Sequence, residues 1–150
     1  MLKSSQVLVK SFAEISKNQL YGILALRIEV FCVEQNCPYQ DIDGLDRDAQ
    51  HIFMQQDEKI IAYARILNLR QKTGRIGRVV VAKEYRNSGF AKQIMLASIR
   101  FCQQQKSMCH IEISAQSYLH DFYQNLGFNS LNKYYLEDDI PHEAMILKLT

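Results

Sequence analysis

The segment IGRVVVAKEYRNSGFA, from Ile76 to Ala91, joins an apolar strand to a helix-patterned stretch that continues to about Gln105. The first amide groups of a helix have no partner within it, and the helix dipole places about half a positive charge there. Gly89 and Ala91 carry little or no side chain, so a pyrophosphate could approach the backbone closely. The segment therefore predicts a site for a phosphate-bearing ligand at the start of the helix.

Two common phosphate-binding motifs do not fit this segment. A Walker loop requires Gly-x-x-x-x-Gly-Lys-Ser/Thr, but Gly89 precedes Phe90-Ala91-Lys92 and has no second glycine upstream at that spacing. A Rossmann fingerprint requires three glycines directly after a strand, and this loop has a single glycine. Residues Arg86 to Ala91 instead match Arg/Gln-x-x-Gly-x-Gly/Ala, and they resemble position by position the pyrophosphate loop of the GNAT acetyltransferases.

Other motifs, over nearly all of residues 18 to 150, resemble the same family in order and spacing. FYQNLGF, from Phe122 to Phe128, is similar to its second signature, Phe-Tyr-x-x-x-Gly-Phe, which ends a helix and enters a strand. Four further segments resemble the ElaA-type branch of the family: Leu26 to Gln35, Pro38 to Asp43, Ala64 to Ile66 and Ile140 to His142. The resemblance implies an α/β fold in one GNAT domain over residues 1–150. Its central twisted mixed sheet would be splayed in the middle and flanked by helices.

The composition sets limits on partners and cellular location. A chain of 150 residues fits one domain, and a hydrophobic fraction of 47% is ordinary for a globular protein. A net charge of +2 predicts no general attraction to nucleic acid or anionic membranes, and the apolar runs are too short to cross a bilayer. Basic residues between Arg70 and Arg86 suit a polyanionic small molecule; they are Lys72, Arg75, Arg78 and Lys83.

The four cysteines, Cys32, Cys37, Cys102 and Cys109, do not have the spacing of a common zinc site. The acidic residues Asp41, Asp43, Asp46 and Asp48 lack the order of a calcium loop, so no metal is expected. Without an export signal, reduced thiols in the cytoplasm are expected. A solvated turn is the first interpretation of the acidic stretch, and a rim that attracts a cationic amine is the alternative.

Hydrophobic periodicity predicts the elements around the loop. An edge strand is expected over residues 6–12, and a helix over 17–33 whose apolar face includes Arg27, either snorkelling or paired with an acid such as Glu34. A hairpin over 51–67, a turn at Thr73-Gly74 and a strand over 109–114 follow. A short helix over 118–126 should end at Gly127 as its C-cap, before closing strands at 128–131 and 144–149.

The family resemblance implies acetyl-CoA as co-substrate and places it on particular residues. The pantetheine would lie along the backbone of Val79, Val80 and Val81, and the pyrophosphate over the loop, which comprises Arg86, Asn87, Ser88, Gly89, Phe90 and Ala91. Many members carry an asparagine after the next strand, where this chain has Ala115-Gln116-Ser117. Gln116 still offers an amide donor and acceptor, one methylene further out.

Acetyl transfer also needs acid and base chemistry. Tyr123 stands where the family usually keeps a tyrosine as general acid, and a phenol with pKa about 10 is protonated at neutral pH. The alternative is a tyrosine that packs beside Phe122 in the core. Candidates for the group that deprotonates the amine are Glu34, Glu112, His142 and a bound water. Arg27, His51 and Arg65 are further candidates for the acceptor site.

Three functions are compatible with these motifs. The preferred one is an N-acetyltransferase that moves the acetyl group directly to a primary amine, in a small molecule or a peptide, because none of the 4 cysteines lies in a nucleophile motif. A non-catalytic acyl-CoA binding or sensing module would use the same loop. An acyl-homoserine lactone synthase is the third, from the similarity of Leu-Arg-x-x-Val-Phe. Homodimers are common in such folds, so self-association is an expectation by analogy.

Overall fold

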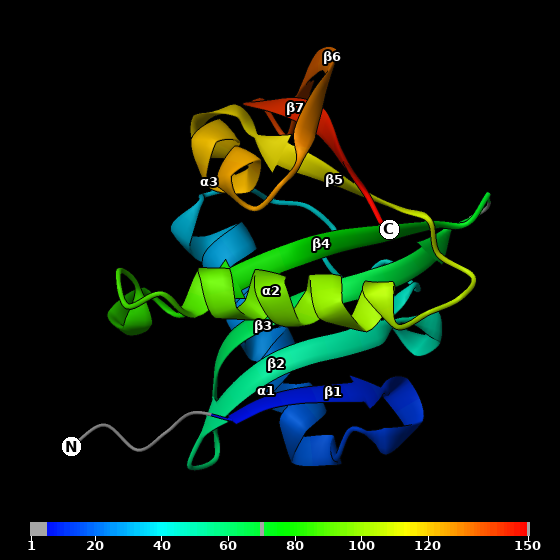
Figure 1. Ribbon diagram of the computed structural model, residues 1–150. Helices are drawn as coiled ribbons and strands as arrows, with labels where there is room; N and C mark the ends of the chain where they lie inside the picture. Colours follow the sequence, from blue (N-terminus) through cyan, green and yellow to red (C-terminus); the bar gives the residue numbers. More distant parts are fainter. Residues whose placement is uncertain (1–5, 70, 150) are drawn as a thin grey trace.

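The structure is a computed structural model that describes residues 6–69 and 71–149 (Figure 1). Within these two ranges, seven strands form one mixed sheet in the order β1-β2-β3-β4-β5-β7-β6. The strands are β1 Gln6–Ser11, β2 Gln50–Gln56, β3 Lys59–Leu69, β4 Thr73–Val81, β5 His110–Gln116, β6 Asn129–Glu137 and β7 Ile140–Lys148. The expected mixed sheet is confirmed. Arg70 of the expected basic cluster lies outside the described residues.

The middle of the sheet opens between β4 and β5. These two strands are parallel and pair only where Thr73 to Arg75 face His110 to Glu112. All other neighbouring strands run antiparallel, and β3 pairs with β4 from Thr73 to Val81, the last residue of β4. Beyond Arg75 the edge of β4 that faces β5 therefore has no strand partner among the described residues. The predicted splay in the middle of the sheet is confirmed.

Helices cover both faces of the sheet (Figure 1). Strand side chains alternate between faces, so Ala62 and Ala64 of β3 pack in one core with α2 (Phe90–Gln103), whereas Tyr63 packs in the other with α1 (Lys17–Ile28). The predicted helix over 17–33 is confirmed, but its last part, Glu29–Glu34, is a π-helical turn. This turn lines the opening between β4 and β5.

The caps of α1 and α3 (His120–Asn125) explain where these helices begin and end. Ser16 accepts a hydrogen bond from the backbone N–H of Gln19, whose side chain returns one, which is a capping box. At the end of α3, Gly127 has φ +104° and donates to Gln124 O, and Phe128 donates to Tyr123 O. These two bonds form a Schellman motif and confirm the predicted C-cap.

Two predictions about local structure are wrong. Thr73 and Gly74 are not a turn but the first residues of β4; positive φ angles at Gln71 and Lys72 mark the turn earlier. The closing strands are longer than expected, because β6 and β7 form a hairpin that turns at Asp138 and Asp139, both with positive φ. β6 is exposed along most of its length, which explains why it lacks a clear apolar pattern.

Candidate functional site

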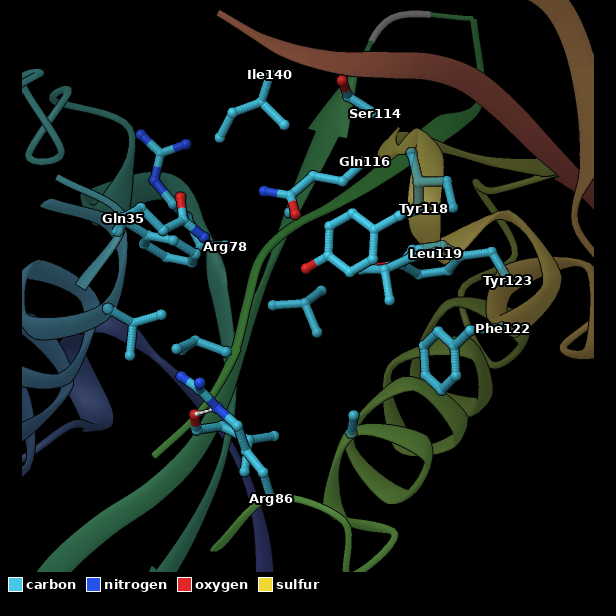
Figure 2. Close-up of a pocket in the computed structure, with 18 of the residues that line it drawn as sticks. Gln35, Arg78, Arg86, Ser114, Gln116, Tyr118, Leu119, Phe122, Tyr123 and Ile140 are labelled. Atoms are coloured by element: carbon cyan, nitrogen blue, oxygen red, sulfur yellow. Dashed lines mark hydrogen bonds between the residues drawn. The ribbon is translucent and has the colours of Figure 1, made fainter. Parts of the chain in front are cut away.

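A cavity of about 910 Å³ occupies the opening between β4 and β5 (Figure 2). Its walls come from the π-helical turn, β4, the loop before α2, the segment from β5 to α3, and the β6–β7 hairpin. Arg86 lies at one end, which we call the loop end, and Ile140 and Ser114 lie at the other, which we call the hairpin end (Figure 2). The cavity thus joins the predicted phosphate loop to residues far along the chain.

The β4 wall presents backbone groups to the cavity. Ala82 donates its N–H to Ile61 O on β3, so the N–H of Val81 points to the opposite side, where no strand pairs with it. Arg78 has φ +52°, and it forms with Val79 a bulge opposite Ala64. All three predicted valines, 79 to 81, line the cavity. Their backbone is available to an extended ligand.

The loop before α2 lines the loop end of the cavity. Gly89 has φ +82° and precedes the first residue of α2, and a Cβ atom placed on it would meet no atom within 4 Å. The space in front of it lies beside the free amides of the helix N-terminus. The predicted loop residues that line the cavity are Arg86, Asn87, Gly89, Phe90 and Ala91. Ser88 is exposed and does not line it.

Glu34 and Arg86 form a bidentate ion pair at the loop end. The two guanidinium nitrogens Nη1 and Nη2 of Arg86 lie 2.7 and 3.0 Å from the carboxylate oxygens, and Nε donates to Val81 O at 3.1 Å. Both oxygens of Glu34 are thereby engaged, at the end of the cavity away from Ile140. This geometry makes Glu34 a partner that orients Arg86.

The ring of Tyr123 packs against two aromatic residues, and Tyr123 also lines the cavity. Its ring meets Phe122 and Phe128 edge-on, with centroids 5.0 and 6.1 Å away, and only 8% of the residue is exposed. Burial raises the pKa of its phenol to about 12, and the neighbouring Tyr118 adds to the shift. Within the described residues, no group forms a hydrogen bond with its hydroxyl, although Tyr123 lines the cavity. The phenol can therefore donate to a ligand.

The third wall is the face of the sheet formed by β5, β7 and β6. In the register of these strands, His142 of β7 stands between Gln116 of β5 and Tyr135 of β6. Side chains two residues apart share a face, so Ser114 and Ile140 lie on this side too. Gln116 points into the cavity beside the hydroxyl of Tyr118 (Figure 2). The predicted cofactor residue Gln116 and the predicted base His142 are thus brought to one wall.

Arg27, His51 and Arg65, the further candidates for the acceptor site, do not line the cavity. They belong to a buried ion-pair cluster, which also contains Asp41, Asp43, Asp46 and Tyr63. Arg27 lies 2.9 Å from Asp41 and 2.7 Å from Asp46, its true partners in place of Glu34. The 41–46 segment folds over α1 and supplies these carboxylates, a contact that helical periodicity does not reveal.

The contacts of the cluster show that part of the acidic stretch is buried and ion-paired, and not a solvated turn. Asp41 and Asp46 are buried, with 3% and 7% exposed, whereas Asp43 and Asp48 are exposed, as expected for a solvated stretch. Burial alone would raise the pKa of Asp43, but hydrogen bonds and charges from Arg65 and others lower it to about 2. The pKa of Asp46 is likewise lowered by Arg27 and Arg65 against the effect of burial. These carboxylates are structural anions.

Glu112 also differs from its prediction. It lies on β5 but does not line the cavity, and its carboxylate is 3.6 Å from Arg75 in a partly exposed pair. Its side chain belongs to the stretch where β4 and β5 still pair, before the opening begins. It is therefore not placed to accept a proton from a ligand in the cavity.

Tyr118, Glu137 and Arg78 are among the cavity residues that the sequence analysis missed as site residues. Arg78 was seen only as part of a basic cluster, yet it donates to Asp41 at 3.0 Å and fixes the bulge of β4. Glu137 would have been found if the β6–β7 hairpin had been predicted at its full length, since it pairs with Ile140. Nothing in the sequence distinguishes Tyr118 from the other tyrosines.

Among residues 6–69 and 71–149, no helix is long and apolar enough to span a bilayer. No three or more His, Cys, Asp or Glu side chains in these ranges gather as they would around a metal ion. All four cysteines are free thiols.

The sequence matches known proteins over most of its length. The family described as "Acetyltransferase (GNAT) domain" matches residues 12–149. Protein ElaA of Escherichia coli is 41% identical over 137 residues, which cover 89% of this chain and 90% of ElaA. The crystal structure of E. coli ElaA superposes with a TM-score of 0.90 at 37% identity, over 96% of this chain and 99% of that one.

Two other crystal structures extend the comparison. An acyl-CoA N-acyltransferase from Pseudomonas aeruginosa has a TM-score of 0.89 and 36% identity, covering 95% of this chain and 99% of that one. The CoA-dependent acyl-homoserine lactone synthase BjaI has a TM-score of 0.81 at 14% identity, covering 98% of this chain and 84% of that one. The second likeness concerns the fold alone.

Proposed function

Because this chain belongs to the GNAT acetyltransferase family, we propose that it transfers the acetyl group of acetyl-CoA directly to a primary amine, with Tyr123 as general acid. The observation that carries the proposal is the position of Tyr123. Its hydroxyl has no hydrogen-bond partner among the described residues and faces the cavity between the parted strands. GNAT enzymes act on amine acceptors, and a primary amine is the acceptor that we propose for this chain.

The residues of the cavity fit acetyl-CoA. The unpaired edge of β4 suits the two amides of a pantetheine arm, which can bond to a strand backbone as another strand would. The open space beside Gly89 and the free amides at the start of α2 suit a pyrophosphate. Lys92 also lines this end and adds positive charge. In this arrangement Arg86, held by Glu34, would frame the anion without occupying its place.

Acetyl transfer places negative charge on the sulfur of CoA as it leaves. When the amine attacks the thioester carbonyl, the carbon–sulfur bond breaks and the electron pair leaves on sulfur. A thiol has a reference pKa of about 8.5, so a proton donor near the sulfur eases departure at neutral pH. With a pKa raised to about 12, Tyr123 remains protonated and available throughout the neutral range. Cys37 lines the cavity, but the raised pKa of its thiol, caused first by burial, disfavours a nucleophilic thiolate.

An acetyl-transfer assay tests the proposal. The protein would be incubated with radiolabelled acetyl-CoA and a panel of primary amines that includes polyamines, amino sugars, amino acids and peptides. We expect label in at least one amine and stoichiometric release of free thiol. If acetyl-CoA binds but no amine is acetylated, the alternative of a non-catalytic acyl-CoA binding or sensing module replaces this proposal. Methionine-derived acceptors with longer acyl-CoA donors in the same assay would detect the homoserine lactone synthase reaction.

A further inference from the structure

His142 and Glu137 meet at the hairpin end of the cavity. Nε2 of His142 lies 3.2 Å from a carboxylate oxygen of Glu137, and both residues line the cavity. The ring of His142 is stacked on Tyr135, at 6.1 Å between centroids and an interplanar angle of 17°. Tyr135 is in turn held by Ser114, with 2.5 Å between their hydroxyl oxygens. The imidazole is therefore fixed in orientation, and it is buried except toward the cavity.

The contacts of the ring determine its tautomer. Nδ1 of His142 lies 2.7 Å from the backbone carbonyl oxygen of Ile140. A carbonyl oxygen can only accept, so Nδ1 must carry the proton of this hydrogen bond. In the neutral imidazole the other nitrogen, Nε2, then has a free lone pair. That lone pair faces the carboxylate of Glu137, which is also an acceptor.

Two acceptors this close need a proton between them, either on Nε2 itself in an imidazolium or from a third group that donates to both. The described groups around the ring do not supply one: Gln116 and Tyr135 flank it from β5 and β6, and neither is bonded to Nε2. An alkylammonium group has three N–H donors and a positive charge, so it can donate to the imidazole nitrogen and to the carboxylate together. Such a group is the protonated form of a primary amine.

We propose that His142 is the base that deprotonates the acceptor amine, and that Glu137 positions the ammonium and stabilises the imidazolium that forms. This inference rests on the proposed function and adds the group that completes it. The N–H bond of the ammonium breaks, its electron pair stays on the amine nitrogen, and the proton forms the Nε2–H bond of His142. The neutral amine can then attack the thioester, and the imidazolium makes an ion pair with Glu137. The acceptor is accordingly an aliphatic amine that is cationic in solution.

Kinetics with two kinds of acceptor test the role of His142. His142→Asn keeps a donor near the position of Nδ1 but has no basic nitrogen. For an alkylamine we expect kcat/KM to fall by about 10²-fold, the lower bound usual for general acid–base catalysis. A weakly basic amine, such as an alkoxyamine, is already neutral near pH 7 and should lose much less. Equal losses for both acceptors would show a structural role and overturn the proposal.

Two further variants, Glu137→Gln and the control His120→Asn, complete the kinetic test. Glu137→Gln should lower kcat/KM for the alkylamine by a smaller factor than His142→Asn, and again spare the weakly basic amine. The control is His120→Asn, because His120 also pairs with a glutamate, Glu143, but neither residue lines the cavity. His120→Asn should change both acceptors alike. A selective loss for the alkylamine in this control would contradict the assignment to His142.

A spectroscopic measurement tests the site without any turnover. Nitrogen-15 NMR of the free protein at about pH 8, where an ordinary imidazole is neutral, reports which ring nitrogen carries the proton. We expect the Nδ1–H tautomer for His142, and a shift of the Nε2 signal when an alkylammonium is added. An Nε2–H tautomer, or an Nε2 signal that does not respond to millimolar alkylammonium, would overturn the proposal. Absence of turnover with every amine would instead count against the proposed function.

Discussion

The buried ion-pair cluster and the wall of the cavity use the same kinds of side chain in opposite ways. In the cluster, the hydroxyl of Tyr63 lies 2.6 Å from Nδ1 of His51, and Arg27 stacks over the tyrosine ring. In the cavity, Tyr123 is almost as deeply buried, yet its hydroxyl has no partner among the described residues. Burial raises the pKa of both phenols above the ordinary value. Burial and pKa therefore do not separate the two regions.

The difference lies in where the polar atoms point. In the cluster the charged groups bond to one another, and the one buried side-chain atom left without a partner is Nε of Arg65 among the residues described. In the cavity, the phenol of Tyr123 has no partner among the described residues, and Nε2 of His142 faces the carboxylate of Glu137, which lines the same cavity. Unpartnered polar atoms around a cavity mark the site for chemistry, and closed networks of the same residues mark structure.

The largest expected effect follows from breaking the closed cluster. Arg27→Met removes the cation that both Asp41 and Asp46 contact and leaves buried carboxylates unpaired. Removing one member of a buried ion pair costs about 3–5 kcal/mol, which urea unfolding would measure. The control is Lys59→Met, because Lys59 pairs with Glu84 on the surface and exposed pairs contribute only about 0–1 kcal/mol. Equal destabilisation by the two variants would show that the cluster is not a stabilising network.

The same substitution in the two tyrosines should have reciprocal effects. Tyr123→Phe should lower kcat by about 10²-fold, equivalent to about 2.7 kcal/mol, with little change in Tm, because only the transition state needs the proton. Tyr63→Phe should leave kcat nearly unchanged and reduce stability by about 1 kcal/mol, because its hydroxyl is hydrogen-bonded to His51. If kcat of Tyr123→Phe stays within about twofold of the wild type, solvent is the acid.

Two glycines of the chain share one backbone conformation, so the same substitution can be compared at both. Gly89 and Gly44 have φ +82° and +83°, and a Cβ atom on either would meet no atom within 4 Å. Valine introduces similar backbone strain at both sites, but only Gly89 lines the cavity. Gly89→Val should weaken acetyl-CoA binding at least tenfold, about 1.4 kcal/mol, in calorimetry. Unchanged affinity in a folded Gly89→Val protein, or equal loss in Gly44→Val, would move the phosphate site elsewhere.

The smallest expected effect is the dependence of stability on acid. The folded-state pKa of Asp43 is lowered to about 2, so its contribution is present above the unfolded pKa of about 4 and is lost as pH falls toward 2. Asp46 contributes in the same direction. Unfolding free energies at pH about 5 and about 3 should therefore fall more steeply for the wild type than for Asp43→Asn. Identical slopes would show that Asp43 carries no stabilising charge interaction.

Much of the loop end of the cavity could be predicted from the sequence because its signals are local. The loop from Arg86 to Ala91 and the capping glycine Gly127 act through backbone geometry that neighbouring residues fix. The acceptor side depends on contacts distant in sequence. Arg27 meets aspartates 14 and 19 residues away, and His142 reaches its place through the register of β5, β7 and β6. Composition and periodicity do not encode such pairings, so the sequence alone did not place Arg27, His51 and Arg65 in the buried ion-pair cluster.

Hydrogen exchange with and without acetyl-CoA tests the central comparison most directly, since it observes both regions in one experiment. The amide of Val81 on the unpaired edge of β4, and the amides from Asn87 to Ala91, should exchange more slowly when acetyl-CoA is bound. Peptides covering the buried ion-pair cluster, around Asp41 to Asp46 and Arg65, should keep their rates. Protection of the cluster without protection of β4 and the loop would contradict the assignment of the cavity as the acetyl-CoA site.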